Sequence, residues 1–165
     1  MIQIGFSDID FISEKDTLTS LNISEKGKLV IKGKTVIGAG CKISIGNGGV
    51  IIFNENVILN GNDVLISYKS LEFGKDTLVS WNCQFMDTDF HTIIKDGSKI
   101  NDDKSISIGE HVWIGSNVTV LKGVCIPKET VIGANSVVSK SLPKANSVYA
   151  GNPICLLKED IEWKR

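Results

Sequence analysis

Residues 108–143 repeat a six-residue pattern six times, and this period constrains the fold more than any other feature of the chain. A strand repeats every two residues and a helix about every 3.6, so neither alone produces a period of six. Short strands that point aliphatic side chains inward and are joined by tight corners do produce it. The hexads open at Ile108, Ile114, Val120, Ile126, Ile132 and Val138. The pattern predicts a solenoid whose three-sided coils each take about 18 residues.

The same period recurs earlier in the chain. Ile31 and Ile37 fit it, and so do Phe73, Val79 and Phe85. Between residues 43 and 72 the aliphatic residues stay dense, but no single register fits them. We therefore predict coils over residues 29–85 and 106–143, preceded by an N-terminal cap region at 1–28. Because stacked strands lie about 4.8 Å apart, five to six coils would form a prism roughly 25–30 Å long.

A polar segment at residues 86–105 interrupts the coils. It contains Gly97, Asn101 and several aspartates, and it carries His91, one of the two histidines of the chain. Insertions in solenoid proteins form loops on one face, which is often the binding face. The segment is therefore predicted to be an active-site loop.

The repeat ends near Pro143, and residues 144–165 have a different pattern. A turn is expected at residues 150–153, which read Ala-Gly-Asn-Pro. Leu156, Leu157, Ile161 and Trp163 could line one side of a short amphipathic helix. Such a C-terminal helix would cover the open end of the solenoid.

The composition limits the classes of function. The 165 residues suffice for a single domain, 1–165, and 42% of them are hydrophobic. A formal net charge of −1 gives no electrostatic reason to expect binding to nucleic acid or to an anionic membrane. No apolar run approaches the roughly 18 residues of a membrane span, and the N-terminus is acidic where a signal peptide is basic. These features favour a cytoplasmic protein.

The four cysteines do not form a metal or disulfide motif. They lie far apart without a Cys-x-x-Cys pair, which disfavours a zinc ribbon or a disulfide framework. Cys41 and Cys83 stand at small, inward-type positions of the repeat, and we expect both in the core.

Four segments in order carry a resemblance to a known family. They are Val-Ser-Trp-Asn at 79–82, Met-Asp-Thr-Asp-Phe-His at 86–91, Ile-Gly-Glu-His-Val-Trp-Ile-Gly at 108–115 and Ala-Gly-Asn-Pro at 150–153. Together they resemble the hexapeptide-repeat acyltransferases, in the branch of acetyl-CoA-dependent sugar O-acetyltransferases that includes maltose, galactoside, capsule and lipopolysaccharide enzymes. The resemblance implies an all-β, left-handed parallel β-helix and a homotrimer with active sites between protomers. It also implies acetyl-CoA as cosubstrate and a sugar or oligosaccharide acceptor.

The resemblance assigns catalytic roles to five residues. His91 would be the general base, because an imidazole with a pKa near 6.5 can accept a proton near neutral pH. Asp87 or Asp89 could orient its ring, or both could be solvated loop acids. Asn82 would lie near the acceptor, or it could be a corner residue. The backbone N–H of Ser116 would face the thioester oxygen.

The resemblance also implies a coenzyme A site. Trp113 would line the cofactor and acceptor entrance or pack in an interface, and the main chain of Ala134 would bond the pantetheine arm. Cys155 stands where the family usually has Lys or Arg, which puts one phosphate contact in doubt. The predicted cofactor residues are Trp113, Ser116, Ala134, Ser139, Lys140 and Lys158.

Three alternatives remain beside O-acetylation. N-acetylation of a nucleotide-linked amino sugar uses nearly the same chemistry, although some such enzymes carry an extra N-terminal domain. A zinc carbonic anhydrase on this fold needs three histidines, whereas this chain has two and His111 is expected at the surface. We therefore expect no metal. A non-catalytic β-helix module needs the hexads but not the four segments together.

Overall fold

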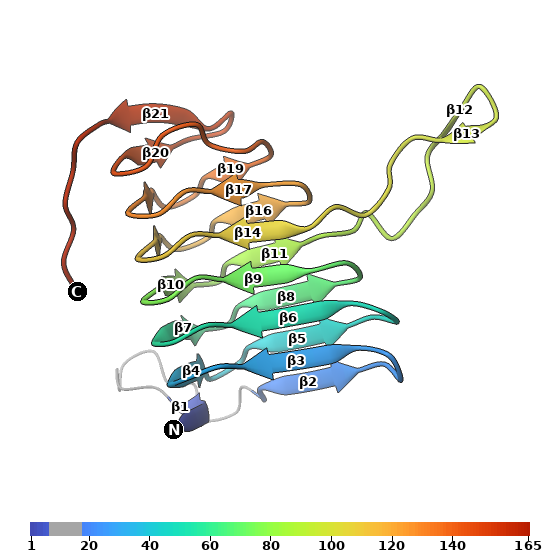
Figure 1. Cartoon of the computed structure of the whole chain (residues 1–165), viewed down its shortest axis with the longest axis horizontal. Helices are drawn as coiled ribbons and strands as arrows, with labels where there is room; N and C mark the ends of the chain where they lie inside the picture. Colours follow the sequence, from blue (N-terminus) through green and yellow to red (C-terminus); the bar gives the residue numbers. More distant parts are fainter. Residues whose placement is uncertain (7–17) are drawn as a thin grey trace.

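The computed structural model describes residues 1–6 and 18–165, and within them every regular element is a β-strand. Three parallel sheets wind around one axis (Figure 1). Sheet A contains β1 (Ile2–Phe6), β4 (Thr35–Gly38), β7 (Val57–Gly61), β10 (Leu78–Trp81), β15 (Trp113–Ile114), β18 (Val131–Ile132), β20 (Val148–Ala150) and β21 (Cys155–Lys158). Sheet B contains β2 (Ser20–Ile23), β5 (Lys42–Ile45), β8 (Val64–Ser67), β11 (Gln84–Met86), β16 (Thr119–Leu121) and β19 (Val137–Val138). Sheet C contains β3 (Lys28–Ile31), β6 (Val50–Phe53), β9 (Leu71–Phe73), β14 (Ile106–Ile108) and β17 (Cys125–Ile126).

The chain visits the sheets in the order A, B, C and then returns to A one level higher. In Figure 1 the sheet C strands run leftward at the front, the sheet B strands run rightward behind them, and the coil climbs. This winding is left-handed, as the family resemblance implies. Strands β1 and β2 already pair with β4 and β5, so the stack begins inside the predicted N-terminal cap region.

The register between coils explains both the clear and the unclear parts of the repeat. In the C-terminal half paired residues are separated by three hexads, as in Trp113↔Val131 and Thr119↔Val137. Earlier, Lys28 pairs with Val50 and Ile51 with Leu71, and both separations are longer than three hexads. The additional residues lie in the corners, so the hexad count slips between residues 43 and 72 although the strands still stack.

The core is the interior of the prism. Strands alternate between buried and partly exposed residues, as in β7 and β9, because successive side chains of a strand point to opposite faces. Phe73 lies between Phe53 and Phe85, with ring centroids 5.2 and 5.0 Å away. Cys41 and Cys83 are fully buried, which confirms their predicted place in the core.

One charged group lies in this interior. Asp63 has no exposed surface; it accepts a hydrogen bond from the Cys83 N–H at 2.8 Å, and its other oxygen lies 3.9 Å from the Cys41 sulfur. Burial raises the pKa of the Asp63 carboxyl to about 7. The native state therefore keeps a proton that the unfolded chain releases as pH rises above about 4.

Asp63 is expected to make the protein less stable at neutral pH than at mildly acidic pH. The pKa of this carboxyl is higher in the folded state than in the unfolded chain. Its contribution to the free energy of unfolding is therefore fully present below about pH 4 and is lost as pH rises to about 7. From pH 5 to pH 8 the loss is about 3 kcal/mol. Asp63→Asn should remove this dependence, and the measurement is the difference in unfolding free energy between the two proteins across that range. An unchanged difference at pH 5 and 8 would contradict the assignment.

The predicted C-terminal helix is wrong. Residues 155–158 form β21, which pairs antiparallel with β20 at the end of sheet A. The last strand of the stack has an unpaired edge, and pairing it satisfies backbone groups that a helix would leave open.

The final residues run as an extended tail down the corner between sheets C and A (Figure 1). The Ile161 N–H donates to the Asn146 carbonyl at 2.9 Å, and Trp163 Nε1 donates to the His111 carbonyl at 2.8 Å. The Trp163 ring stacks on His111 with centroids 4.1 Å apart, and Arg165 donates to the Asp76 carbonyl at 3.3 Å. The tail therefore contacts several coils at once.

Candidate active site

The long interruption is a projecting loop, as predicted. It leaves sheet B after β11 and enters sheet C at β14, so it occupies residues 87–105 at the corner between these sheets (Figure 1). Its tip is a hairpin of β12 (Ile94–Lys95) and β13 (Ser98–Lys99). Asp96 and Gly97 have positive φ of 50° and 75°, the conformation that an Asp-Gly hairpin turn requires. The sequence analysis missed the hairpin, although this Asp-Gly pair indicates one.

A network of hydrogen bonds fixes the backbone around His91. Asn101 Nδ2 donates to the His91 carbonyl at 2.7 Å, and its Oδ1 accepts from the Ile93 N–H at 2.7 Å. Lys122 Nζ pairs with the Asp89 carboxylate and donates to the Asn101 carbonyl at 3.0 Å. Lys122 and Asn101 also hold the pKa of the Asp89 carboxyl below its usual range. Asp89 thus ties the loop to the solenoid through Lys122.

Asp87 was expected to orient the His91 ring, but its carboxylate contacts other residues. It is fully buried and accepts three hydrogen bonds from the last residue of β8 and the corner that follows it. These come from Ser67 Oγ at 2.8 Å, the Tyr68 N–H at 2.7 Å and the Lys69 N–H at 2.9 Å. Within the described residues neither Asp87 nor Asp89 hydrogen-bonds the His91 ring. Both carboxylates are used to shape the loop and the neighbouring corner.

His91 is exposed at the base of the loop and borders a small pocket of about 140 Å³. The pocket opens at the corner between sheets B and C. It is lined by Tyr68, Thr88, Phe90, His91, Thr92, Lys99, Asn101 and Asp103.

Most of the predicted cofactor residues lie elsewhere, on sheet A and at the corner between sheets A and B. Trp113 projects from β15, is 39% exposed, and donates from Nε1 to Ser80 Oγ at 3.3 Å. Ser116 follows β15, and its carbonyl accepts from the Asn135 N–H at 2.9 Å. Ala134 lies on the next coil, directly above Gly115: a Cβ built on Gly115 would stand 2.7 Å from the Ala134 nitrogen.

Asn82 occupies the same corner one coil below. It has φ of 60°, and Asn62, Asn117 and Asn135 repeat this left-handed conformation at φ of 56–58° on neighbouring coils. Asparagine tolerates this region better than most residues, so the corner requirement alone accounts for the residue type. Asn82 therefore lies with Ser116, at the opposite end of sheet B from His91 in the same chain.

The remaining predicted cofactor residues lie near the C-terminal end of the stack. Ser139 and Lys140 follow β19 and are exposed at the corner between sheets B and C. Lys158 ends β21, where Cys155 is also exposed. Within one chain, Ser116 and Ala134 therefore lie at the other end of sheet B from the His91 pocket. The distance between them is the length of a sheet B strand, roughly 10–13 Å.

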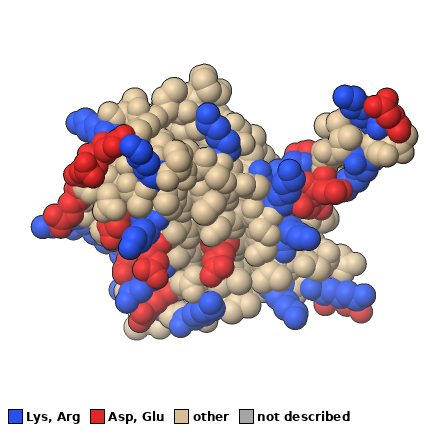
Figure 2. Space-filling model, turned by 45° about the horizontal axis from the view of Figure 1, so that its top comes forward, with Lys and Arg blue, Asp and Glu red and all other residues tan. Residues whose placement is uncertain are grey.

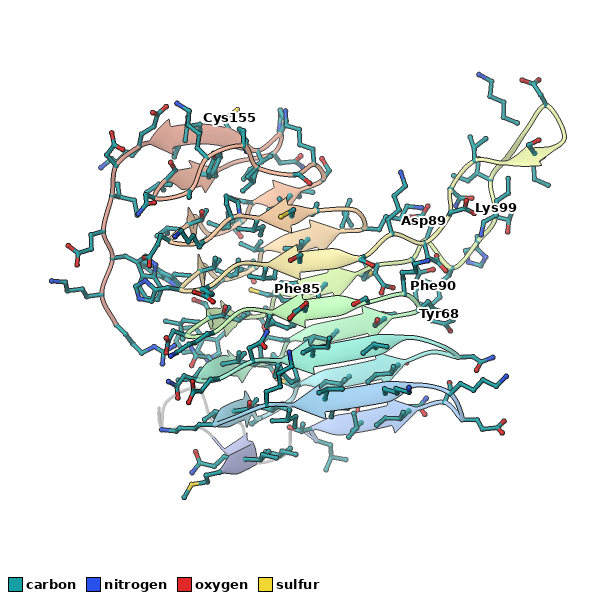
Figure 3. All side chains as sticks on the ribbon, viewed as in Figure 1. Tyr68, Phe85, Asp89, Phe90, Lys99 and Cys155 are labelled. Carbon is teal, nitrogen blue, oxygen red and sulfur yellow. The ribbon has the colours of Figure 1, made fainter. Side chains whose placement is uncertain are left out.

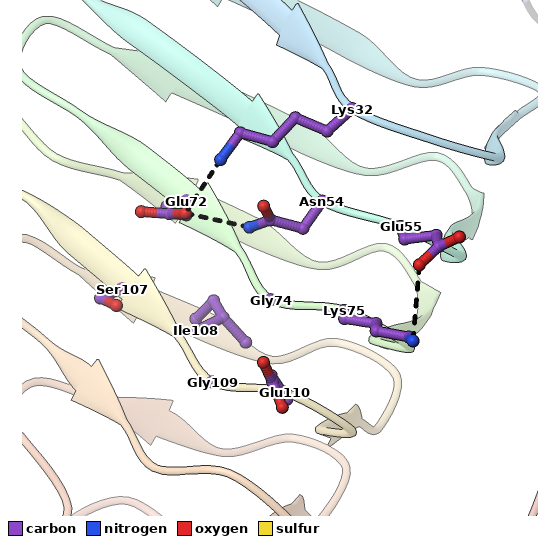
Figure 4. A pocket seen from close by; sticks show the side chains of 10 residues that line it. All are labelled: Lys32, Asn54, Glu55, Glu72, Gly74, Lys75, Ser107, Ile108, Gly109 and Glu110. Carbon is purple, nitrogen blue, oxygen red and sulfur yellow. Dashed lines mark hydrogen bonds and ion pairs between the residues drawn. The ribbon is translucent and has the colours of Figure 1, made fainter.

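A larger groove of about 640 Å³ lies at the far end of the sheet C strands, toward sheet A (Figure 4). Most of its charged groups already have partners: Glu72 contacts Asn54 at 2.9 Å and Lys32 at 4.0 Å, and Lys75 pairs with Glu55 at 3.4 Å. None of the sequence-predicted site residues lines it. The smaller pocket beside His91 is therefore the better candidate for chemistry.

Comparison with known proteins agrees with the fold. A family model described as bacterial transferase hexapeptide (six repeats) matches residues 105–140. A polysialic acid O-acetyltransferase of Neisseria meningitidis is 33% identical over 167 residues, covering 98% of this chain and 78% of that protein. The chain belongs to the hexapeptide-repeat acyltransferase family. The prediction made from the four segments is thereby confirmed.

Solved structures of the hexapeptide-repeat acyltransferases extend this comparison. A polysialic acid O-acetyltransferase superposes with a TM-score of 0.65 at 27% identity, covering 99% of this chain and 90% of that one. A galactoside acetyltransferase in complex with coenzyme A gives a TM-score of 0.59 at 25% identity, covering 79% and 64%. The predicted left-handed parallel β-helix is confirmed by both. Within residues 1–6 and 18–165, no helix is long and apolar enough to span a membrane, and no group of three potential metal ligands occurs.

Proposed function

We propose that this protein transfers the acetyl group of acetyl-CoA to a sugar hydroxyl, with His91 as general base. The observation that carries the proposal is the place of His91, exposed beside a pocket on a loop whose backbone Asn101 and Lys122 hold fixed. The relative from Neisseria meningitidis is named for the same reaction on polysialic acid. A surface polysaccharide or its precursor in the cytoplasm is therefore the proposed acceptor.

The reaction proceeds by direct attack in a ternary complex. His91 removes the proton of the acceptor hydroxyl, and the oxygen attacks the thioester carbonyl of acetyl-CoA. The Ser116 N–H, which donates no other hydrogen bond within the described residues, stabilises the oxyanion. The tetrahedral intermediate then releases the coenzyme A thiolate, which takes the proton from His91. The products are the acetyl ester and free coenzyme A, with no acyl-enzyme.

The site is completed between protomers of a homotrimer. His91 lies at one end of sheet B, whereas Ser116, Ala134 and Asn82 lie at the other. A trimer around a three-fold axis can bring the His91 corner of one protomer against the Ser116 corner of the next. In this arrangement Trp113, Ser139, Lys140 and Lys158 contribute to the groove for coenzyme A.

Coenzyme A is expected to stabilise the protein. A ligand that binds only the native state at about 100 times its Kd adds about 2.7 kcal/mol, which raises Tm by about 5–10 °C for a chain of this size. Differential scanning fluorimetry measures the shift, and thiol release from acetyl-CoA with a panel of saccharides measures the transfer. Ala134→Glu should abolish the shift, whereas Ile94→Ala on the exposed hairpin should retain it. Absence of both shift and thiol release would favour a non-catalytic module.

Asn101→Ala is expected to lower kcat by about tenfold, because two hydrogen bonds that fix the backbone of the His91 loop disappear. The KM for acetyl-CoA should stay unchanged, since Ser116 and Ala134, the residues predicted to hold the thioester and the pantetheine arm, lie at the opposite end of sheet B. Steady-state thiol release measures both constants. Asp102→Ala is the matched control, because the exposed Asp102 carboxylate pairs with Lys99 on the loop itself. Equal effects of the two variants would refute the role of Asn101.

A further inference from the structure

Two exposed aromatic rings lie beside His91, and the mechanism above does not use them. Tyr68 follows β8, and Phe90 immediately precedes His91. Figure 3 shows both at the base of the loop, whereas Phe85 points into the coil. The rings meet edge to face with centroids 5.7 Å apart, and 41% of Tyr68 and 56% of Phe90 remain exposed. Together they form one wall of the His91 pocket.

The backbone of Phe90 is strained. Its φ is 60°, a left-handed conformation that a bulky residue rarely adopts and that costs about 1–3 kcal/mol. The Phe90 N–H donates to Thr88 Oγ1 at 3.0 Å, which helps to hold the conformation. The side chain gains little from burial in return, since more than half of the residue is exposed. Strain of this kind is typical of ligand sites, where it presents a side chain in a fixed position.

Tyr68 is held in place by the same carboxylate that begins the loop. Asp87 accepts the Tyr68 N–H at 2.7 Å and the Lys69 N–H at 2.9 Å while its own backbone leads toward Phe90. The two rings are therefore positioned relative to each other before any ligand arrives. Pre-organised walls of this type lower the entropy cost of binding.

The polar rim of the pocket has no net charge. Lys99 and Asp103 line it with opposite charges, and Lys99 also pairs with Asp102 at 3.3 Å. Asp89, at the base of the loop, is neutralised by Lys122. In Figure 2 acidic and basic side chains are mixed on the projecting loop. Such a rim offers hydrogen bonds to hydroxyl groups without selecting an anionic ligand.

We propose that Tyr68 and Phe90 form an aromatic platform for the acceptor, an edge-to-face corner against which the apolar C–H face of an uncharged sugar ring packs. Its hydroxyl groups meet Lys99 and Asp103, and one of them faces His91. Aromatic rings supply a large apolar contact and polar groups fix the orientation, which suits a ring with one apolar face and a polar edge. The proposal rests on the proposed function and narrows its acceptor to neutral sugars.

The first test removes a ring and keeps the backbone. Phe90→Asn retains a residue type that tolerates positive φ, and Phe90→Tyr retains the ring. With neutral glucose, galactose or N-acetylglucosamine oligosaccharides, Phe90→Asn should raise the acceptor KM by about tenfold and leave the acetyl-CoA KM unchanged. Phe90→Tyr and Ile94→Ala, the latter on the same loop outside the pocket, should resemble the wild type. An unchanged acceptor KM in Phe90→Asn would overturn the platform, and so would a preference for oligosialic acid over every neutral sugar.

The second test measures binding without turnover. Saturation-transfer NMR with the neutral oligosaccharides should show contact to ring C–H protons in the wild type and in His91→Ala. The contact should disappear in Phe90→Asn and in Tyr68→Ala. If the contact disappears in these two variants but the wild type shows no acetyl transfer, the proposed function fails and the sugar site stands. If Phe90→Asn dissociates the oligomer in analytical ultracentrifugation, the ring contacts a second protomer and the platform is refuted.

Discussion

His91→Ala is expected to lower kcat for acetyl transfer by about 100-fold or more, because the acceptor hydroxyl loses its base. The variant should fold normally. His91 is exposed, and within the described residues its ring makes no hydrogen bond, so the substitution removes no packed group. Thiol release measures the rate, and circular dichroism with analytical ultracentrifugation checks fold and assembly. The coenzyme A thermal shift should persist, since Ser116 and Ala134 of the same chain lie at the opposite end of sheet B from His91.

His111→Ala is the matched control for the other histidine of the chain. The His111 ring stacks on Trp163, and its Nδ1 lies 2.6 Å from Glu129 Oε2. Its loss should lower Tm and leave kcat near the wild-type value. Wild-type turnover in His91→Ala would refute the general-base mechanism, and so would an equal loss of turnover in both variants at a temperature where both are folded.

Phe73→Ala is expected to reduce the free energy of unfolding by about 3–5 kcal/mol. Phe73 is fully buried, and its ring fills the prism between Phe53 and Phe85. The substitution leaves a cavity. The coils above and below cannot move in to fill it, because their spacing is fixed by the backbone hydrogen bonds of three sheets. Urea unfolding followed by circular dichroism measures the change, with wild type and variant at the same protein concentration because an oligomer gains stability by mass action.

Phe90→Ala provides the comparison for a phenylalanine outside the core. More than half of Phe90 is exposed, so its loss should change the unfolding free energy by about 0.5 kcal/mol or less. A small effect of Phe73→Ala, similar to that of Phe90→Ala, would show that the aromatic stack does not stabilise the solenoid.

The regular coils could be predicted because each inward side chain follows from local sequence. Where Ser107 pairs with Cys125, the partners are three hexads apart and the repeat is evident. Between β5 and β6 the chain passes through Gly46–Gly49, and a Cβ built on Gly49 would lie 2.2 Å from the Ser67 carbonyl oxygen. Such a corner depends on the approach of the next coil, so its length is not encoded in a local period. The prediction of a C-terminal helix was wrong for a similar reason, because Trp163 hydrogen-bonds to His111, 52 residues away.

The candidate site was predictable only in part. The interruption of the repeat located the loop, and the resemblance singled out His91. The contacts that hold the loop were not predictable, because Lys122 meets Asp89 across 33 residues and stands at an ordinary position of a later hexad. Asp87 and Asp89 belong to one short motif, yet the fold directs them to different partners. A motif identifies which side chains are present, but their division of roles follows from the stacking of distant coils.

The extended C-terminal tail has a consequence for cooperativity. In a solenoid each coil contacts only its neighbours, so coils at the ends can detach one at a time. Here the tail bonds the carbonyls of Asn146, His111 and Asp76, which belong to three different levels of the stack. Fraying of the last coil must therefore release contacts made far below it. The tail couples the two halves of the prism on either side of the His91 loop, and it favours their unfolding as one unit.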